Sequence, residues 1–284
     1  MTLNDALRDA FGAELRRSDP VSGGDINDAF ALTLTDGARV FMKSNRAASP
    51  AFFQAEAAGL AAICDTGAIS VPSVIAVGSD AATGAFLLLQ WVDSAPRARD
   101  FWEDFGHSLA MMHLAPTPAR FGWDHDNYIG ASPQINARRE SWVAFFRDCR
   151  LAPQFDRAKR WFDAGDRGRI DRLLDHLDEH LVEPDRPALL HGDLWSGNFI
   201  TGSDGRAWLI DPAAYVGHRE ADLAMTELFG GFHPRFYEAY REARPLQPGY
   251  ARRRDLYNLY HLLNHLNLFG GGYLGAVRSI LKRY

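Results

Sequence analysis

The sequence predicts an α+β protein with two lobes: a small β-rich N-terminal lobe over residues 1–93 and a larger, mainly helical C-terminal lobe over residues 94–284. Before the boundary, short apolar runs alternate with turn dipeptides, which is typical of a small antiparallel sheet. After it, apolar residues recur mostly with the helical period of about 3.6 residues. No internal repeat and no low-complexity linker interrupts the chain.

The N-terminal lobe is predicted to contain two helices and a sheet. Residues 1–17, MTLNDALRDAFGAELRR, have the pattern of an amphipathic helix. A second helix is expected from Pro50 to about Cys64, with Ser49 as N-cap and proline in the first turn. Asp36-Gly37 is a dipeptide that two-residue hairpin turns prefer. The predicted strands cover residues 30–35, 38–44, 74–78 and 85–92.

The C-terminal lobe is predicted to be helical apart from two short strand-like runs. These runs are LLHGDLWSGNFI and RAWLID, on either side of a turn at residues 202–205. The polar residues between LL and FI are therefore expected on a loop held by short strands. The predicted helices cover residues 97–114, 136–150, 155–182, 219–229, 233–243, 249–268 and 273–283.

Composition excludes several classes of protein. The chain has 284 residues, 46% of them hydrophobic, and no apolar run approaches the length of about 18 residues that a membrane span requires. The N-terminus lacks the pattern of a signal peptide. The net charge of −5 gives no reason to expect nucleic acid or an anionic membrane as a partner. Cys64 and Cys149 have neither disulfide nor metal spacing, so we expect a reducing cytoplasm.

The stretch HGDLWSGN carries the strongest chemical signal. Asp193 follows His191 by two residues, Asn198 follows Asp193 by five, and Asp211 ends the next strand-like run. Acids and an amide on adjacent loops offer the oxygen ligands that Mg²⁺ prefers beside phosphate. In the protein-kinase pattern H-R-D-x-x-x-x-N, the Asp accepts the proton of the substrate hydroxyl, and the Asn and a later Asp hold the metal. The alternative is a cluster of turn-forming Asp and Asn residues.

The phosphate-holding half of such a site is predicted in the N-terminal lobe. Only three of the 31 basic residues are lysines, and one of them, Lys43, ends the second strand of the hairpin. Glu56 falls within the apolar stripe of the following helix, where a carboxylate is unfavourable unless it is paired, so we expect it to pair with Lys43. Gly23 and Gly24 occupy the turn before the hairpin, where a kinase has a flexible loop over the phosphates.

HGDLWSGN, followed by IDPAAYVGHREADLAMTELFGGF at residues 210–232, resembles the fructosamine kinase (ketosamine-3-kinase) family. This family is a branch of the protein-kinase-like fold that includes aminoglycoside phosphotransferases and choline kinases. FGWDHDNYIGASPQIN at 121–136 and SWVAFFRDCRLAPQ at 141–154 are also similar to it, so the resemblance spans nearly the whole chain. The Leu-Trp-Ser-Gly filling and the GHREADLAM run distinguish this family from its relatives.

The resemblance implies a two-lobed protein-kinase-like fold and an ATP-dependent phosphotransferase. The implied substrate is a ketosamine, the fructosamine or ribulosamine adduct of a small amine or a protein, phosphorylated on the sugar 3-hydroxyl as a step of deglycation repair. Asp193 is the implied base, and Asn198 and Asp211 are the implied Mg²⁺ ligands.

The resemblance also implies a nucleotide site in the N-terminal lobe. Lys43, oriented by Glu56, is implied on the phosphates of ATP, beneath the Gly23-Gly24 turn. By analogy LLLQWV is the hinge, in which the Gln90 carbonyl and the Val92 amide bind adenine. Trp91 between them is bulkier than such a hinge leads one to expect.

Three further residues are candidates for substrate contact. Trp195 is either a wall of the sugar site or a core aromatic residue. His218 and Glu220 closely follow the metal Asp and are candidates to face the substrate, whereas Asp222 is expected to anchor the catalytic loop. Asp193, Glu220 and Asp222 together would make the acceptor side anionic, which favours a substrate carrying a cationic amine. His191 is expected to fix the loop through a backbone hydrogen bond.

Other functions are less favoured. His176 with His180, and His261 with His265, are i,i+4 pairs that lack a third ligand nearby in the sequence, which favours surface or core histidines over zinc sites. A catalytically inactive binding module usually lacks the lysine, the base or the metal acid, and all are present here. The chain has no GxSxG, Walker or HExxH motif of a hydrolase. An aminoglycoside or choline-type phosphotransferase is the alternative within kinases.

Overall fold

The computed structural model describes residues 1–21 and 26–284. The chain forms two compact units. Met1–Phe101 and Phe199–Pro212 make up the N-terminal unit, and Trp102–Asn198 and Ala213–Tyr284 make up the C-terminal unit. The sequence suggests a single division after residue 93, whereas the chain crosses between the observed units three times.

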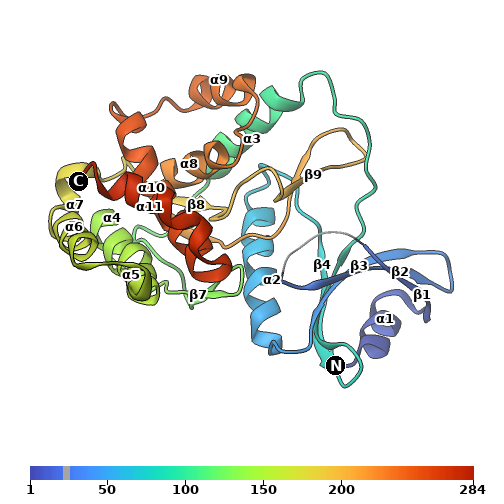
Figure 1. The fold of residues 1–284 in the computed structure, drawn as a ribbon. Coiled ribbons are helices and arrows are strands. Elements are labelled where there is room, and N and C mark those ends of the chain that lie inside the picture. Colours follow the sequence, from blue (N-terminus) through green and yellow to red (C-terminus); the bar gives the residue numbers. More distant parts are fainter. Residues whose placement is uncertain (22–25) are drawn as a thin grey trace. The chain divides into compact units, whose positions relative to one another are not determined.

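A five-stranded antiparallel sheet forms the centre of the N-terminal unit, with the strand order β1-β2-β3-β5-β4. Helices α1 (Leu3–Phe11) and α2 (Pro50–Asp65) lie on opposite faces of this sheet (Figure 1). The α1 face is a closed apolar core that includes Leu7, Val40 and Phe86. Strand alternation therefore turns the side chain of Lys43 towards α2. The strands are β1 (Leu15–Pro20), β2 (Asp28–Leu34), β3 (Arg39–Asn45), β4 (Val74–Asp80) and β5 (Gly84–Gln90).

The first strand of this sheet differs from the expectation of one helix over residues 1–17. The helix stops at Phe11 because Gly12 adopts the left-handed conformation, with φ 65°, and its amide caps the carbonyl of Arg8. The chain then continues as β1, an edge strand whose side chains are mostly exposed. An exposed edge strand needs no apolar alternation, so the sequence pattern does not reveal it.

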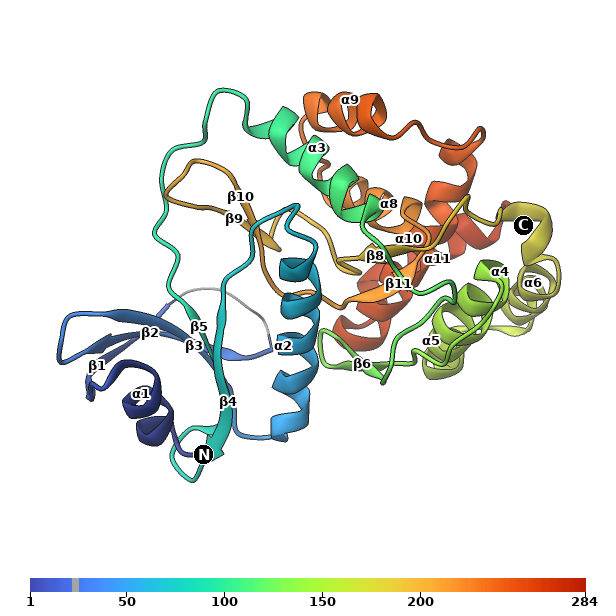
Figure 2. The same cartoon turned by 180° about the vertical axis from the view of Figure 1, so that it is seen from behind.

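The segment Phe199–Pro212 contributes a hairpin to the N-terminal unit. Its strands β9 (Phe199–Thr201) and β10 (Ala207–Leu209) are antiparallel neighbours, as Figure 2 shows from behind. The Leu209 amide donates to the Ser70 carbonyl at 2.8 Å, and the Ala98 amide donates to the Gly205 carbonyl at 3.0 Å. These bonds join the hairpin to residues of the same unit that lie more than a hundred positions earlier in the chain.

The C-terminal unit is mainly helical. Its central helix is α10 (Tyr250–Phe269), of which 11 residues are buried. Two short strand pairs accompany the helices, β6 (Asn127–Ile129) with β7 (Ser132–Gln134) and β8 (Ala188–Leu190) with β11 (Tyr215–Gly217). The other α-helices are α3 (Phe101–Leu114), α4 (Trp142–Phe146), α5 (Ala152–Ala158), α6 (Ala164–Asp175), α7 (Leu177–His180), α8 (Glu220–Leu228), α9 (Pro234–Ala243) and α11 (Leu274–Leu281).

The predicted helices 136–150 and 155–182 are wrong in their extent. Residues 136–141 are not helical, and a π-helical turn, Arg147–Leu151, separates α4 from α5. Asp163 then begins a new helix with a capping box to Asp166. Helical periodicity runs through these interruptions because each piece buries an apolar stripe in the same core.

Across residues 1–21 and 26–284, no helix combines the length and the apolar character that a membrane span needs.

Candidate functional site

The loop that carries HGDLWSGN is fixed from below by one buried carboxylate. The amides of His191 and Gly192 donate to the two oxygens of Asp222 at 2.7 and 2.8 Å, and His113 Nε2 lies 3.2 Å from the same group. Burial would raise the pKa of Asp222, but the hydrogen bond and charge of His113 and the amide bonds outweigh burial and hold that pKa below its usual range. The expected anchoring role of Asp222 is therefore present.

His191 and Gly192 complete the turn of this loop. His191 is fully buried, and its Nδ1 accepts a hydrogen bond from the Asp193 amide at 3.3 Å. Gly192 has a φ of 81°, and a Cβ atom there would collide with the Ala213 carbonyl. Glycine is thus required both by the backbone conformation and by the close approach of the Ala213 backbone.

Asp193 and Asn198 meet at the head of the loop. The Asn198 side-chain amide donates to the backbone carbonyl of Asp193 at 2.7 Å and to Asp193 Oδ2 at 3.0 Å. No hydrogen bond within the described residues engages Asn198 Oδ1. Because the amide nitrogen is committed to Asp193, the carbonyl oxygen is the atom that Asn198 offers to a cation.

Lys43, Glu56 and Asp211 form a buried ionic cluster in the N-terminal unit. Lys43 Nζ donates to Glu56 Oε1 at 2.7 Å and also to Asp211 Oδ1. Burial would lower the pKa of Lys43, but the carboxylates of Asp211 and Glu56 outweigh it and raise that pKa above its ordinary value. The pairing expected from the position of Glu56 in an apolar stripe is present, and the lysine remains a cation.

Asp211 has an unusual backbone. Its φ is 57°, and it is the one non-glycine residue with a positive φ in residues 1–21 and 26–284. A left-handed conformation is costly for most residues and is tolerated best by Asn and Asp. The strain turns the chain directly after β10, where the Asp211 side chain reaches Lys43.

Trp91, which directly follows β5, is held in place by two side-chain contacts. The Arg39 guanidinium stacks on the Trp91 ring at 3.7 Å, and Trp91 Nε1 donates to Asp93 Oδ1 at 2.9 Å. The bulky Trp91 ring therefore packs on the side chain of Arg39, at the start of β3. Gln90 Oε1 accepts from the Ser73 amide, and in the described chain no backbone hydrogen bond engages the Val92 amide.

His218 and Glu220 are turned into the C-terminal unit. Glu220 is 0% exposed, and Arg253 donates to both of its oxygens at 2.8 Å. His218 is also 0% exposed; its Nε2 bonds Gln247, and its ring packs on Trp142. Both side chains serve the interior, which corrects the expectation that they face a substrate.

This correction weakens the charge argument for the acceptor side. Glu220 is neutralised by Arg253, and Asp222 is occupied by loop amides and His113. Of the three carboxylates in that argument, Asp193 is the one whose side chain keeps substantial exposure, at 21%.

Trp195 lies on the surface of the HGDLWSGN loop. It is 37% exposed, and its ring meets Phe229 edge-on at 6.1 Å. A Cβ atom on Gly197 would collide with the Trp195 ring, so this glycine leaves the space in which the indole lies. Of the two expectations for Trp195, a wall or a core residue, its exposure favours the wall.

The remaining candidates are outside the described residues or have other roles. Gly23 and Gly24 lie in residues 22–25, outside the part of the chain that the structure describes. His176 and His265 each bond a backbone carbonyl four residues earlier. Within the described ranges no three His, Cys, Asp or Glu side chains gather as a metal site.

Two histidines near the loop are not predicted from the sequence as parts of the site. His113 supports Asp222 from a helix 109 residues earlier, and nothing in its local pattern marks it. In the sequence His261 is only half of an i,i+4 pair, whereas in the structure its Nδ1 lies 3.8 Å from Asp193 Oδ1. A shallow pocket elsewhere in the C-terminal unit, too small to admit a water molecule, is lined by Leu223, Glu227, Tyr237, Tyr240, Arg241, Leu246 and Tyr250.

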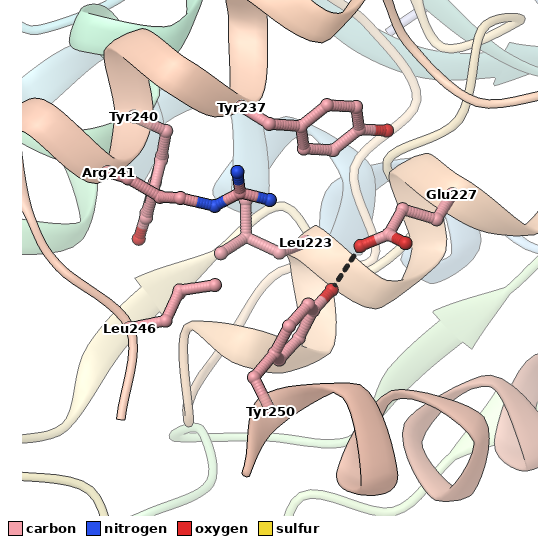
Figure 3. Close-up of a pocket in the computed structure, with 7 residues that line it drawn as sticks. All are labelled: Leu223, Glu227, Tyr237, Tyr240, Arg241, Leu246 and Tyr250. Atoms are coloured by element: carbon pink, nitrogen blue, oxygen red, sulfur yellow. Dashed lines mark hydrogen bonds between the residues drawn. The ribbon is translucent and has the colours of Figure 1, made fainter. Parts of the chain in front are cut away.

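That pocket is a packing feature of α8, α9 and the start of α10. Figure 3 shows the Tyr250 hydroxyl directed at Glu227, to which it donates at 2.6 Å. Arg254 binds the other carboxylate oxygen at 2.9 Å. Both carboxylate oxygens of Glu227 therefore accept hydrogen bonds from neighbouring side chains, which indicates a structural role for this residue.

A small antiparallel sheet with a lysine–glutamate pair, and a helical unit with an Asp-x4-Asn loop, define a protein of the kinase-like class. The family model for fructosamine kinase matches residues 1–284, and the chain belongs to this family. The recognition made from HGDLWSGN and the predicted fold class are confirmed.

Relatives and solved structures agree with this assignment. A probable ketoamine kinase of Synechocystis sp. is 44% identical, over 96% of this chain and 91% of that protein. A chloroplastic protein-ribulosamine 3-kinase of Oryza sativa subsp. indica is 40% identical, over 93% of this chain and 77% of that protein.

The crystal structure of a putative fructosamine-3-kinase from Haemophilus somnus superposes with a TM-score of 0.89 at 29% identity, covering 99% of this chain and 96% of that one. An aminoglycoside phosphotransferase, at 16% identity, has a TM-score of 0.63 over 99% of each chain and shows the shared fold alone.

Proposed function

We propose that this protein is an ATP-dependent kinase that phosphorylates the sugar 3-hydroxyl of ketosamines, as a step in the removal of sugars from amines or proteins. The observation that carries the proposal is the geometry of the catalytic loop. Asp193 is a partly exposed carboxylate, oriented by Asn198 at 3.0 Å, on a loop whose amides are held by the buried Asp222. The named activities of the related ketoamine and ribulosamine kinases supply the substrate class.

Asp193 acts as the general base in this proposal. As the sugar oxygen forms its bond to the γ-phosphorus, the bond from that phosphorus to the bridging oxygen of ADP breaks, and the hydroxyl proton passes to Asp193. The carboxylate is suited to this task because Asn198 fixes its rotamer. A phosphoryl transfer needs little more from the protein than such positioning and charge stabilisation.

Asn198 and Asp211 are the proposed Mg²⁺ ligands. Their side chains fit the ion by donor type, because the oxygen of Asn198 carries no hydrogen bond within the described residues and Asp211 is a carboxylate. Two protein oxygens suit Mg²⁺ that arrives with phosphate ligands, and the described chain offers no larger cluster of acids. Bound Mg²⁺ would neutralise charge on the phosphates of ATP.

The N-terminal unit is proposed to bind the nucleotide. Lys43 is a buried cation held by Glu56 and Asp211, and transfer of its bond from Asp211 to phosphate oxygens would pair it with the nucleotide while Glu56 keeps it in place. The Gln90 carbonyl and the Val92 amide are proposed to bind adenine. Trp91 lies between Gln90 and Val92 in the chain, and stacking on Arg39 holds it in place.

The acceptor is proposed to lie against Trp195, whose exposed indole can pack on the apolar face of a sugar. The negative charge of Asp193 suits the ammonium of a ketosamine. We propose a reducing cytoplasm as the location of the protein, because both of its cysteines, Cys64 and Cys149, are free thiols.

Incubation with Mg-ATP and fructosyl-lysine or ribulosyl-lysine tests the proposal, with kanamycin and choline as competing acceptors. A phosphate on C3 leaves once the ketosamine enolises towards C1, so the product should release inorganic phosphate and free lysine. Phosphorylated kanamycin or choline would persist. Phosphorus NMR over several hours therefore reports both transfer and position.

Variants of the base provide the control. Asp193→Asn should lower turnover by about 10²- to 10⁴-fold and leave ADP binding intact. Asp171→Asn, at an exposed position of α6, is the matched control and should be unchanged. Transfer to kanamycin or choline, with none to either ketosamine, would overturn the proposed substrate. Full turnover of the Asp193 variant would overturn the proposed base.

A further inference from the structure

His261 is a buried side chain with an unexplained polar atom. It belongs to α10, and it is 4% exposed. Its Nδ1 is buried and has no hydrogen-bond partner among residues 1–21 and 26–284. Buried polar atoms are nearly always paired, so an orphan atom in a folded protein needs an explanation.

A charged group close to this atom is the carboxylate of Asp193. His261 Nδ1 lies 3.8 Å from Asp193 Oδ1, while the other oxygen, Oδ2, accepts from Asn198. His261 and Asn198 thus lie next to different oxygens of the same carboxylate. A distance of 3.8 Å is too long for a hydrogen bond, but a shift of about 1 Å would close it. Catalytic hydrogen bonds are often long without substrate and tighten in the reacting complex.

The chemistry of the ring assigns the donor. A proton on Nδ1 points a positive dipole at the carboxylate, whereas a proton on Nε2 would point the Nδ1 lone pair at it. Burial, together with the neighbouring His265, lowers the pKa of His261 to about 3, so the ring is neutral at physiological pH. A neutral donor orients Asp193 without cancelling the negative charge that a base needs.

The backbone of α10 keeps the ring in place. Tyr260 donates its hydroxyl to Gln134 at 2.7 Å, and Gln154 donates to Asn264 at 3.2 Å, so the residues before and after His261 are tied to other elements. The Tyr260 ring also meets the His261 ring edge-on at 5.2 Å.

We propose that His261 is a positioning residue for Asp193: its Nδ1–H donates to Oδ1 in the reacting complex and, opposite Asn198 on Oδ2, locks the carboxylate towards the acceptor hydroxyl. Each carboxylate oxygen has two acceptor sites, so a hydrogen bond from His261 does not by itself prevent Asp193 from taking the substrate proton. This inference rests on the proposed function, because it takes Asp193 as the base.

The test uses an isosteric pair of substitutions. In His261→Asn the amide nitrogen can occupy the place of Nδ1, and in His261→Leu a methyl group replaces it. We expect a loss of about tenfold or more in kcat for His261→Leu, with little change in the KM for ATP, since a hydrogen bond to a charged group is lost. His261→Asn should stay within about threefold of the unmodified protein.

A double-mutant cycle separates positioning from a general loss of structure. In the Asp193→Asn background, His261→Leu should change the residual rate by less than about twofold, because the group that it orients is gone. Equal losses for the Asn and Leu variants, an unchanged kcat for His261→Leu, or equal losses with and without the Asp193 carboxylate would each overturn the inference. Thermal unfolding and ADP binding, measured on all variants, show whether the fold is kept.

The same cycle distinguishes failure of this inference from failure of the proposed function. Should ketosamines not be phosphorylated, the proposed substrate fails, and the cycle is measured with whichever acceptor of the panel is used, or with water through slow ATP hydrolysis. Should ketosamines be phosphorylated in an Asp193-dependent way without coupling to His261, only the positioning role fails.

Discussion

Replacing Glu220 with Gln tests whether the buried Glu220–Arg253 pair serves stability or substrate. Both side chains are almost fully buried, and Arg253 donates to both oxygens of Glu220 at 2.8 Å. Removing one charge of a buried pair leaves the other uncompensated, which costs about 3–5 kcal/mol. Arg253 keeps its bonds to the carbonyls of Pro248 and Gln247, and Gln retains one acceptor, so we expect the lower end, about 3 kcal/mol.

Urea and thermal unfolding followed by tryptophan fluorescence measure this loss, and the KM for a ketosamine is measured alongside. For a chain of this size the melting temperature should fall by on the order of 10 °C. Adding Arg253→Met to Glu220→Gln should recover about 2 kcal/mol relative to the sum of the two single changes, because the uncompensated cation is removed as well. Glu179→Gln, at an exposed position of α7, is the control and should leave the midpoint unchanged. An unchanged midpoint with a raised acceptor KM would refute the reasoning and return Glu220 to the substrate site.

Lys43→Arg should reduce kcat markedly while the protein stays folded, because a planar fork replaces a compact ammonium group; full activity would remove its special role. His218 and His261 have folded pKa values of about 3, lowered by burial from 6.5, so stability present above pH 6.5 should be lost as the pH falls towards 3. The slope is ~1.4 kcal/mol per pH unit for each histidine, and urea midpoints that do not fall with pH would contradict it. Gly197→Ala should displace the Trp195 ring, shifting its fluorescence and raising the acceptor KM more than the ATP KM; unchanged values would refute this.

The parts of the site that the sequence predicts are those encoded locally. Asp193 and Asn198 are five positions apart in one loop, so their spacing alone indicates that they meet. The contact of Lys43 with Glu56 spans 13 positions, and it is predictable because a carboxylate in an apolar helical stripe needs a partner. In both cases a local rule limits where the partner can lie.

The parts that the sequence does not predict depend on distant partners. Lys43 and Asp211 are 168 positions apart, and His113 and Asp222 are 109 apart. Neither pairing produces a periodic pattern or a compositional bias in the sequence. Glu220 was misplaced for the same reason: a carboxylate beside a catalytic segment suggests exposure, and Arg253, 33 positions later, is what allows it to be buried.

The same distinction between local and distant information applies to the predicted helices and strands. The four strands of the N-terminal sheet that contain apolar runs were predicted within a few residues, whereas β1, an exposed edge, was not. The helical unit was predicted as helical, but its helix ends were misjudged where a π-helical turn and the Asp163 cap interrupt a continuous apolar stripe. Periodicity reports which face is buried, and it does not report where hydrogen bonding changes.

The hairpin Phe199–Pro212 has a consequence for synthesis on the ribosome. The N-terminal unit lacks this segment until residue 212 has been made, by which time Trp102–Asn198 has already left the exit tunnel or is passing through it. A nascent chain of residues 1–101 has no Asp211 for Lys43 and no Leu209 amide for Ser70. The N-terminal unit, which we propose binds the nucleotide, is therefore completed only after most of the chain has emerged, and fragments that end at residue 101 should be poor substitutes for it. A self-contained small unit would need Phe101 joined by a short linker to Phe199–Pro212.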